Sequence, residues 1–332
     1  MVQEDIQYYV EGVLAHNRLV LSKTITIVES THPRHQEMAL EIVDRLLPHT
    51  GRAMRIGITG VPGAGKSTFI ETFGLLLLDK GCHVAVLAVD PSSKRSGGSI
   101  MADKTRMEKL SVGKNAFIRP SPSGGTLGGV AQKTRETMLV CEAAGFDVVI
   151  VETVGVGQSE TTVASMVDFF LVLMIPGAGD ELQGIKRGIL ELADAVVINK
   201  ADGDNIGRAQ LAKREYETAL HLANPPSPHW SAPVLTCSAL EMTGIDAIWD
   251  TVVRHNGTLN ITGEIEQKRK EQALEWTRFL ITEGLRDWFY NSPRVQEMLP
   301  MLRKKVESGA MTPTHAAREL LVLFANTNGK KV

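Results

Sequence analysis

The fold of this chain is decided by one stretch, Gly60-Val-Pro-Gly-Ala-Gly-Lys-Ser-Thr68. An apolar run typical of a β-strand (54–59) precedes it, and a helix-like run (68–79) follows it. The motif G-x-x-x-x-G-K-[ST] between a strand and a helix is a phosphate-binding loop. Its glycines let successive backbone N–H groups turn toward an anion, and the helix adds the positive end of its dipole. The stretch therefore predicts a nucleoside triphosphate site.

Two side chains of this loop have specific tasks in binding a triphosphate. We expect Lys66 to reach the β- and γ-phosphates and the hydroxyl of Ser67 to bind Mg²⁺. The expected nucleotide-binding residues of the loop are Gly60, Val61, Pro62, Gly63, Ala64, Gly65, Lys66, Ser67 and Thr68.

The composition of the 332 residues narrows the class of protein. The net charge is −2, from 36 basic and 38 acidic residues, and no long basic stretch occurs, which argues against nucleic acid or an anionic membrane as the main partner. The longest apolar run, 169–176, is too short to span a bilayer, and the first residues lack a signal-peptide pattern. Three scattered cysteines argue against a disulfide framework and favour a reducing, cytoplasmic compartment.

The pattern along the chain divides it into three segments. Residues 1–51 carry apolar side chains at helical spacing and predict an N-terminal helical segment. Residues 52–257 alternate β-rich runs with helical stretches, as in the α/β fold of a P-loop NTPase, a mainly parallel sheet flanked by helices. The expected strands are 54–59, 83–89, 116–119, 147–152, 168–175, 194–199 and 233–236. In such a sheet the ligand lies beyond the carboxyl ends of the strands.

Residues 258–332 differ in composition and predict a C-terminal helical segment. The run 264–290 is rich in charged residues and is expected to form one helix. Four apolar residues fall on one face of it: Leu274, Ile281, Leu285 and Trp288. Such a stripe either packs on its own domain or pairs with a second copy, and its place after a nucleotide domain favours a dimerisation arm. Shorter helices are expected after it, separated by Pro293, Pro300 and Pro313.

Two apolar strands run into carboxylates that are followed by glycine-containing loops. Asp90 comes directly after its strand, Asp103 lies at the far end of the next loop, and both are candidate Mg²⁺ ligands. Alternatively, each of them forms a turn or a helix cap. Glu152 occupies the Walker B position, where aspartate is commoner, and the N–H of Gly155 is expected near the γ-phosphate. Gln158 either orients the attacking water or has a structural role.

A further pair of motifs indicates which base is bound. Asn199-Lys200-Ala-Asp202 is N-K-x-D at the end of a buried strand. A carboxylate can accept from both N1–H and N2–H₂ of guanine, whereas adenine offers no matching pair of donors. We expect Asp202 in this role, with Asn199 bracing the loops and the stem of Lys200 against the ring. Backbone N–H groups that meet the guanine carbonyl oxygen are expected at Ser238, Ala239 and Leu240. The motifs favour GTP and GDP over ATP.

Taken together, these stretches resemble the MeaB/ArgK group of G-protein chaperones of adenosylcobalamin-dependent methylmalonyl-CoA mutase, which includes the methylmalonic aciduria type A protein. The specific strings are Val89-Asp-Pro-Ser-Ser93 and Glu152-Thr-Val-Gly-Val-Gly-Gln-Ser-Glu160, and Gly179-Asp-Glu-Leu-Gln-Gly-Ile-Lys186 also matches the group. The resemblance extends over essentially the whole chain, including both helical segments.

The resemblance implies a slow GTPase that forms homodimers through its C-terminal arm, docks on the mutase, gates cofactor loading and helps to remove damaged cobalamin. It implies that Mg²⁺ is held by Ser67, Asp90, Asp103 and Glu152. It also implies that Lys186 lies in an additional switch loop (about 177–188) that responds to the bound mutase. Alternatively, Lys186 is a solvated lysine on a helix face.

The motifs and the resemblance together predict a molecular switch, with Lys66, Glu152 and Lys186 as catalytic residues. GTP with Mg²⁺ is expected to order the loops 91–105, 153–160 and 177–188. No obvious arginine finger lies in the nucleotide loops, so we expect weak basal turnover that rises when the mutase repositions Lys186 or another basic group.

Two other functions are alternatives. A metal-delivery GTPase for nickel enzymes shares the Walker B glutamate, but it needs a Cys/His metal site, and here no cysteine lies near another and there is no histidine-rich tract. An ATP-dependent kinase of an amino-acid transport system needs ATP, and the N-K-x-D motif argues against that base.

Overall fold

The computed structural model describes residues 6–89, 107–120, 127–153, 159–177, 187–221 and 227–328. By its internal contacts the chain divides into two compact units, Met1–Lys268 and Arg269–Val332. The domain boundaries expected at 51/52 and 257/258 stay predictions. Within the described residues, no helix is both long enough and apolar enough to cross a membrane.

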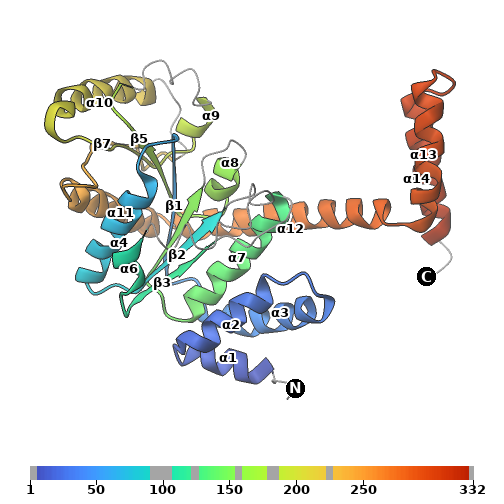
Figure 1. Ribbon diagram of the computed structural model, residues 1–332, viewed down its shortest axis with the longest axis horizontal. Helices are drawn as coiled ribbons and strands as arrows, with labels where there is room; N and C mark the ends of the chain where they lie inside the picture. Colours follow the sequence, from blue (N-terminus) through green and yellow to red (C-terminus); the bar gives the residue numbers. More distant parts are fainter. Residues whose placement is uncertain are drawn as a thin grey trace. The chain divides into compact units, whose positions relative to one another are not determined.

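The first unit is built on a seven-stranded sheet in the order β3-β2-β4-β1-β5-β6-β7, and all neighbouring strands are parallel (Figure 1). The strands are β1 Met54–Gly60, β2 Val84–Val89, β3 Ala116–Arg119, β4 Val148–Thr153, β5 Phe169–Met174, β6 Ala195–Ile198 and β7 Val234–Thr236. The seven expected strands are therefore confirmed to within one residue at each end. They are continuous apolar runs because both faces of the sheet are covered, and all six residues of β5 are buried.

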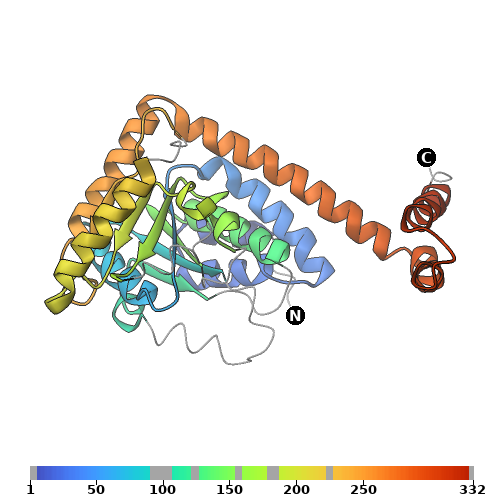
Figure 2. The same cartoon turned by 90° about the horizontal axis from the view of Figure 1, so that it is seen from above.

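Helices cover both faces of this sheet (Figures 1 and 2). The helices of this unit are α1 Ile6–Leu14, α2 Arg18–Val28, α3 Pro33–Leu46, α4 Lys66–Asp79, α6 Glu108–Ser111, α7 Leu127–Ala143, α8 Ser159–Ala164, α9 Arg187–Leu190, α10 Ile206–His221 and α11 Ile245–Ile261. Helix α4 contacts α6 and α11, whereas α7 and α8 contact each other and strand β4. Short 3-10 turns lie at Leu47–His49 and Gly203–Asn205.

The N-terminal helices, which the sequence predicted, pack against α7. His16 has a left-handed backbone (φ 58°), and its Nδ1 lies 2.6 Å from the carbonyl oxygen of Ala144. At the end of α2, Glu29 forms an ion pair with Arg119, the last residue of β3. These contacts attach the segment to the sheet domain.

The second unit contains most of α12 (Glu264–Tyr290), together with α13 (Pro293–Glu307) and α14 (Pro313–Asn328). Its small core consists of Val295, Leu302, Ala316 and Leu320, with Phe289 and Phe324 packed against it. Pro293 and Pro313 begin helices, where a missing N–H costs nothing. The expectation that Pro300 separates two helices was wrong, because it lies inside α13. There the burial of Val295 and Leu302 on both sides of the proline outweighs the lost hydrogen bond.

Candidate functional site

The phosphate loop connects the end of β1 to the start of α4, as its motif requires. Gly63 and Gly65 have φ angles of 77° and 81°, in the left-handed region that favours glycine. Gly60 has a different reason to be glycine: a Cβ there would lie 2.2 Å from the carbonyl oxygen of Leu173 on β5. The loop can therefore form only where β1 approaches β5 without a side chain.

Replacing Gly60 by alanine is expected to destabilise the protein by about 1–3 kcal/mol, because the atom that the new methyl group meets is backbone and cannot rotate away. GDP affinity should fall with it, since the phosphate loop has to shift. Thermal unfolding and GDP titration measure both effects. The control is Gly207→Ala in α10, where a Cβ meets open space. Unchanged stability and affinity in Gly60→Ala would contradict the assigned role of this contact.

Lys66 lies folded back onto the loop, where its Nζ donates a hydrogen bond of 2.8 Å to the carbonyl oxygen of Gly60. Burial lowers the pKa of Lys66 from its usual value, while the negative charges of Glu152 and Glu160 act in the opposite direction. A phosphate group in the loop would add negative charge next to this ammonium group and favour its charged form. The position suits a lysine that binds phosphate.

Two of the side chains expected to bind Mg²⁺ lie near each other at the end of β4. The hydroxyl of Ser67 donates to Oε1 of Glu152 at 3.5 Å, so the two expected ligands face the same point. A hydroxyl and a carboxylate are the hard oxygen donors that Mg²⁺ prefers, and in this respect they fit the ion. The other expected ligands, Asp90 and Asp103, lie outside the described residues.

Three further expected site residues also lie outside the described residues: Gly155, Gln158 and Lys186. Within the described residues, no three His, Cys, Asp or Glu side chains lie together in a way that would hold a metal ion. The nickel-delivery alternative therefore has no candidate metal site in that part of the chain.

The side chain of Asn199 joins the phosphate loop to the base-recognition loops. Its Nδ2 donates to the carbonyl oxygen of Ala64 at 2.8 Å, and its Oδ1 accepts from the N–H of Ala239 at 3.0 Å. Asn199 is buried, so these hydrogen bonds are protected from water. One amide thereby holds together the loop for the phosphates and the loop for the base.

Asp202 is held by the loop that follows β7. The hydroxyl of Ser238 donates a 2.5 Å hydrogen bond to Oδ2 of Asp202, and the hydroxyl oxygen in turn accepts from the N–H of Glu241 at 3.1 Å. Lys200 has a left-handed backbone (φ 60°), uncommon for a residue with a side chain. This left-handed turn lies between Asn199 and Asp202 in the N-K-x-D loop.

Sequence reasoning missed several side chains that the structure brings to this site. Glu160 is buried in the first turn of α8 and acts electrostatically on Lys66. Thr59 and Thr153 form a buried hydrogen bond between β1 and β4. Glu160 ends one of the specific strings of the sequence and could have been considered, whereas the threonine pair becomes visible only once the two strands are neighbours.

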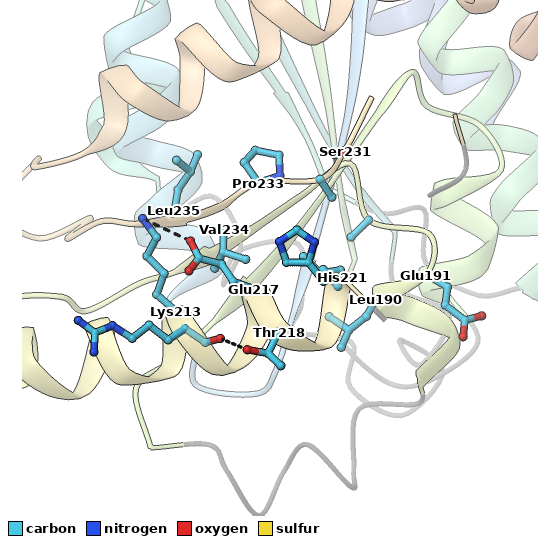
Figure 3. A pocket seen from close by; sticks show the side chains of 14 residues that line it. Leu190, Glu191, Lys213, Glu217, Thr218, His221, Ser231, Pro233, Val234 and Leu235 are labelled. Atoms are coloured by element: carbon cyan, nitrogen blue, oxygen red, sulfur yellow. Dashed lines mark hydrogen bonds and ion pairs between the residues drawn. The ribbon is translucent and has the colours of Figure 1, made fainter. Parts of the chain in front are cut away.

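A separate cavity of about 830 Å³ lies between α10 and β7 (Figure 3). One wall is made by α10, which carries the Lys213–Glu217 ion pair at 3.8 Å, and the other by residues 231–235. None of the phosphate-loop, Walker B or N-K-x-D residues lines it. Among the described residues, the lining of this cavity therefore has no residue in common with those motifs.

The parallel sheet, the phosphate loop and the joined N-K-x-D loop define the class of this protein, a P-loop NTPase of the G-protein type. The family model described as "Methylmalonyl Co-A mutase-associated GTPase MeaB" matches residues 21–294. The chain therefore belongs to the MeaB family of GTPases, as the sequence motifs indicated.

Individual relatives agree with this assignment. The chain is 55% identical over 320 residues to a "Putative GTPase" of Caulobacter vibrioides, covering 96% of this chain and 98% of the relative. It is 49% identical over 303 residues to "GTPase ArgK" of Escherichia coli, covering 91% and 92%. The "Methylmalonic aciduria type A homolog, mitochondrial" of Mus musculus is 46% identical over 323 residues, covering 94% of this chain and 78% of the relative.

A solved structure described as "Crystal structure of LAO/AO transport system kinase" has the same fold. It superimposes with a TM-score of 0.79 at 40% identity and covers 97% of this chain and 98% of that one.

Proposed function

We propose that this protein is a GTP-driven molecular switch that serves as a chaperone of adenosylcobalamin-dependent methylmalonyl-CoA mutase, where it gates cofactor loading and protects or reactivates the mutase. The family description and the name of the mouse relative support the mutase as partner. The main structural support for GTP as the ligand is the pair of hydrogen bonds by which Asn199 joins the phosphate loop to the base loops. A nucleotide with its phosphates in one loop and its base in the other needs both loops in one fixed arrangement, and the Asp202 carboxylate favours guanine as that base.

Each residue of the site has its own role in phosphoryl transfer. The Lys66 ammonium group binds the β- and γ-phosphates, and Asp202 accepts from N1–H and N2–H₂ of guanine. Ser67 and Glu152, with Asp90 and Asp103, would hold Mg²⁺, which supplies positive charge against the phosphates. Gly155 contributes its N–H to sensing of the γ-phosphate, and the loops 91–105, 153–160 and 177–188 respond to that group.

Basal turnover is expected to be slow, because the transferring phosphoryl group needs one more cation than Lys66 and the metal provide. Lys186 is proposed as that cation, brought into place when the mutase binds. In other GTPases a cation supplied in this way raises the rate by about 10³–10⁵-fold.

We expect Lys186→Ala to lose most of the stimulation by the mutase, about 10³-fold, while its basal turnover stays near that of the wild type. The measurement is GTP turnover with and without purified mutase. Lys213→Ala is the control, since Lys213 is a surface lysine of α10 paired with Glu217. If the mutase leaves wild-type turnover unchanged, the partner assignment fails. If Lys186→Ala is stimulated like the wild type, only the role of Lys186 fails.

The proposal includes a homodimer formed through the C-terminal arm. The four stripe residues of α12 are 61% (Leu274), 57% (Ile281), 54% (Leu285) and 54% (Trp288) exposed in the single chain. A stripe of exposed, large apolar side chains on a helix that is rich in charged residues is typical of a surface that a partner covers. The free thiols of Cys82, Cys141 and Cys237 fit a reducing, cytoplasmic compartment.

The related structure of a transport system kinase supports one alternative, an ATP-dependent kinase of such a system. This function and the GTP switch differ in one directly measurable property, the affinity for GTP relative to ATP. The carboxylate of Asp202, which the hydroxyl of Ser238 holds in place, favours guanine, because adenine offers no matching pair of donors for it.

A further inference from the structure

We propose that Thr59 and Thr153 form a hydroxyl pair that positions the Glu152 carboxylate against the phosphate loop and thereby sets the Mg²⁺ dependence of nucleotide binding. The inference rests on the proposed GTPase function and adds two positioning residues to it.

The pair is a direct contact between two neighbouring strands. The hydroxyl of Thr153 donates to the hydroxyl of Thr59 at 2.8 Å, and the two residues are 0% and 2% exposed. Strands β1 and β4 are paired in parallel with Ile58 opposite Glu152, so the two threonines are the next residues along the strands. The bond therefore adds a side-chain contact to the backbone ladder at the carboxyl ends of the two strands.

Each threonine lies next to a residue of the nucleotide site. Thr59 precedes Gly60, the first residue of the phosphate loop, and Thr153 follows Glu152. The distance between the Ser67 hydroxyl and Oε1 of Glu152 is 3.5 Å, so a small slip of β4 against β1 would change it substantially. The hydroxyl pair is placed to prevent that slip.

The surroundings of the pair explain why two hydroxyls have a specific effect here. Gly57 lies two residues before Thr59 on the same face of β1, and a Cβ there would meet Phe170, Val163 and Val167 at 2.9 Å. In this tightly packed apolar layer, valine would suit either threonine position in a strand. A buried hydroxyl is costly unless it has a partner, so each threonine favours the register in which it meets the other.

Glu152 would itself contact the metal, whereas the threonines act through its position. Residues that orient a metal ligand typically contribute 10–100-fold to metal affinity or activity. We therefore expect Thr153→Val to raise by about tenfold the Mg²⁺ concentration needed for half-maximal tightening of GDP binding. GDP affinity without Mg²⁺ should stay within about twofold, because Asp202 and the backbone of the phosphate loop are unchanged.

The double variant Thr59→Val/Thr153→Val separates positioning from stability. A single valine leaves one buried hydroxyl without its partner and lowers the melting temperature, whereas two valines remove both polar groups and restore it. The Mg²⁺ requirement should remain raised in the double variant, because two methyl groups impose no register. Thr153→Ser keeps the hydroxyl and is expected to behave like the wild type.

The experiment measures GDP binding to the full chain across a Mg²⁺ titration, together with thermal unfolding, for the wild type and these variants. Thr251→Val is the matched control, since Thr251 is buried in α11 and its hydroxyl donates within the same helix, to the carbonyl oxygen of Ala247. A double variant with the Mg²⁺ response of the wild type overturns the positioning role. Absence of GDP binding to the wild type would overturn the proposed function, and this inference with it.

Discussion

Asp202→Asn is expected to weaken GTP and GDP binding by about 10²–10⁴-fold, because two hydrogen bonds to a charged acceptor contribute about 1.5–3 kcal/mol each. In the variant, the amide nitrogen faces the guanine N–H groups and at best one of the two bonds survives. The hydroxyl of Ser238 can still donate to the amide oxygen, so the loop itself should keep its conformation.

Binding of xanthosine triphosphate tests the Asp202→Asn variant by a gain of affinity, which a misfolded protein would not show. Its C2 carries a carbonyl oxygen where guanine has an amino group, so an asparagine amide can donate to it. We expect Asp202→Asn to bind xanthosine nucleotides more tightly than the wild type does. Equilibrium titrations with GTP, ATP and xanthosine triphosphate measure all three preferences for both proteins.

The control for this experiment is Asp204→Asn, an exposed aspartate two residues further along the same loop. It should leave every preference unchanged. Two results would contradict the assignment: wild-type protein that binds ATP as tightly as GTP, or an Asp202→Asn variant that still prefers guanine.

The sheet could be predicted from the sequence because its strands are short apolar runs that end in recognisable motifs. Val148–Val151, for example, is entirely apolar and entirely buried, and it is followed by Glu152. Such runs have one stable place, inside a sheet covered on both faces. Pro300 was misjudged for the opposite reason, since local propensity suggested a break and tertiary packing on α14 kept the helix intact.

The motifs named candidate residues one by one and predicted that Asn199 braces the loops, but they did not say which distant residues it contacts. N-K-x-D names Asn199 and Asp202, yet the bond from Asn199 to Ala64 spans 135 residues of sequence. The Thr59–Thr153 bond spans 94 residues and depends on strand order, which no local pattern encodes. Spacing within a motif is a local property, whereas these contacts depend on which strands become neighbours.

Asp194, His255 and Lys268 form a cluster at the amino ends of the strands, opposite the nucleotide site. It is another contact between residues that lie far apart in the sequence. Asp194 directly precedes β6, and its Oδ2 accepts a 2.8 Å hydrogen bond from the N–H of Phe170. Nζ of Lys268 lies 3.6 Å from Oδ2, and Nε2 of His255 lies 3.5 Å from Oδ1. The backbone oxygen of Asp194 accepts from the indole N–H of Trp230. The aspartate thus ties β5 and β6 to α11 and the start of α12.

Asp194→Ala is expected to destabilise the first unit by about 3–5 kcal/mol, because it leaves partly buried charge and the N–H of Phe170 without this acceptor. Urea unfolding followed by circular dichroism measures the loss. Asp246→Ala is the contrasting control: Asp246 pairs with Lys80 at 3.1 Å on the surface, and we expect at most about 1 kcal/mol.

The pH dependence of this loss distinguishes a charge effect from a packing effect. Burial alone would raise the pKa of Asp194, but the charge of Lys268, the nearby imidazole of His255 and the hydrogen bond from the N–H of Phe170 outweigh it and hold the pKa below its usual value. A carboxyl group with a lowered pKa in the folded state stabilises the protein fully above its unfolded pKa of about 3.9, and the contribution declines as pH falls through the folded pKa.

The stability difference between wild type and Asp194→Ala should therefore be constant from pH 7 to about pH 5 and shrink below about pH 4. Asp194→Asn keeps the size of the side chain and an acceptor for the N–H of Phe170, but it has no charge to lose. At neutral pH the loss of stability in Asp194→Asn should be smaller than that in Asp194→Ala. It should also shrink as the pH falls over the same range. A loss in Asp194→Ala that is the same at pH 7 and pH 3.5 would mean that packing, rather than the charge of Asp194, holds these elements together.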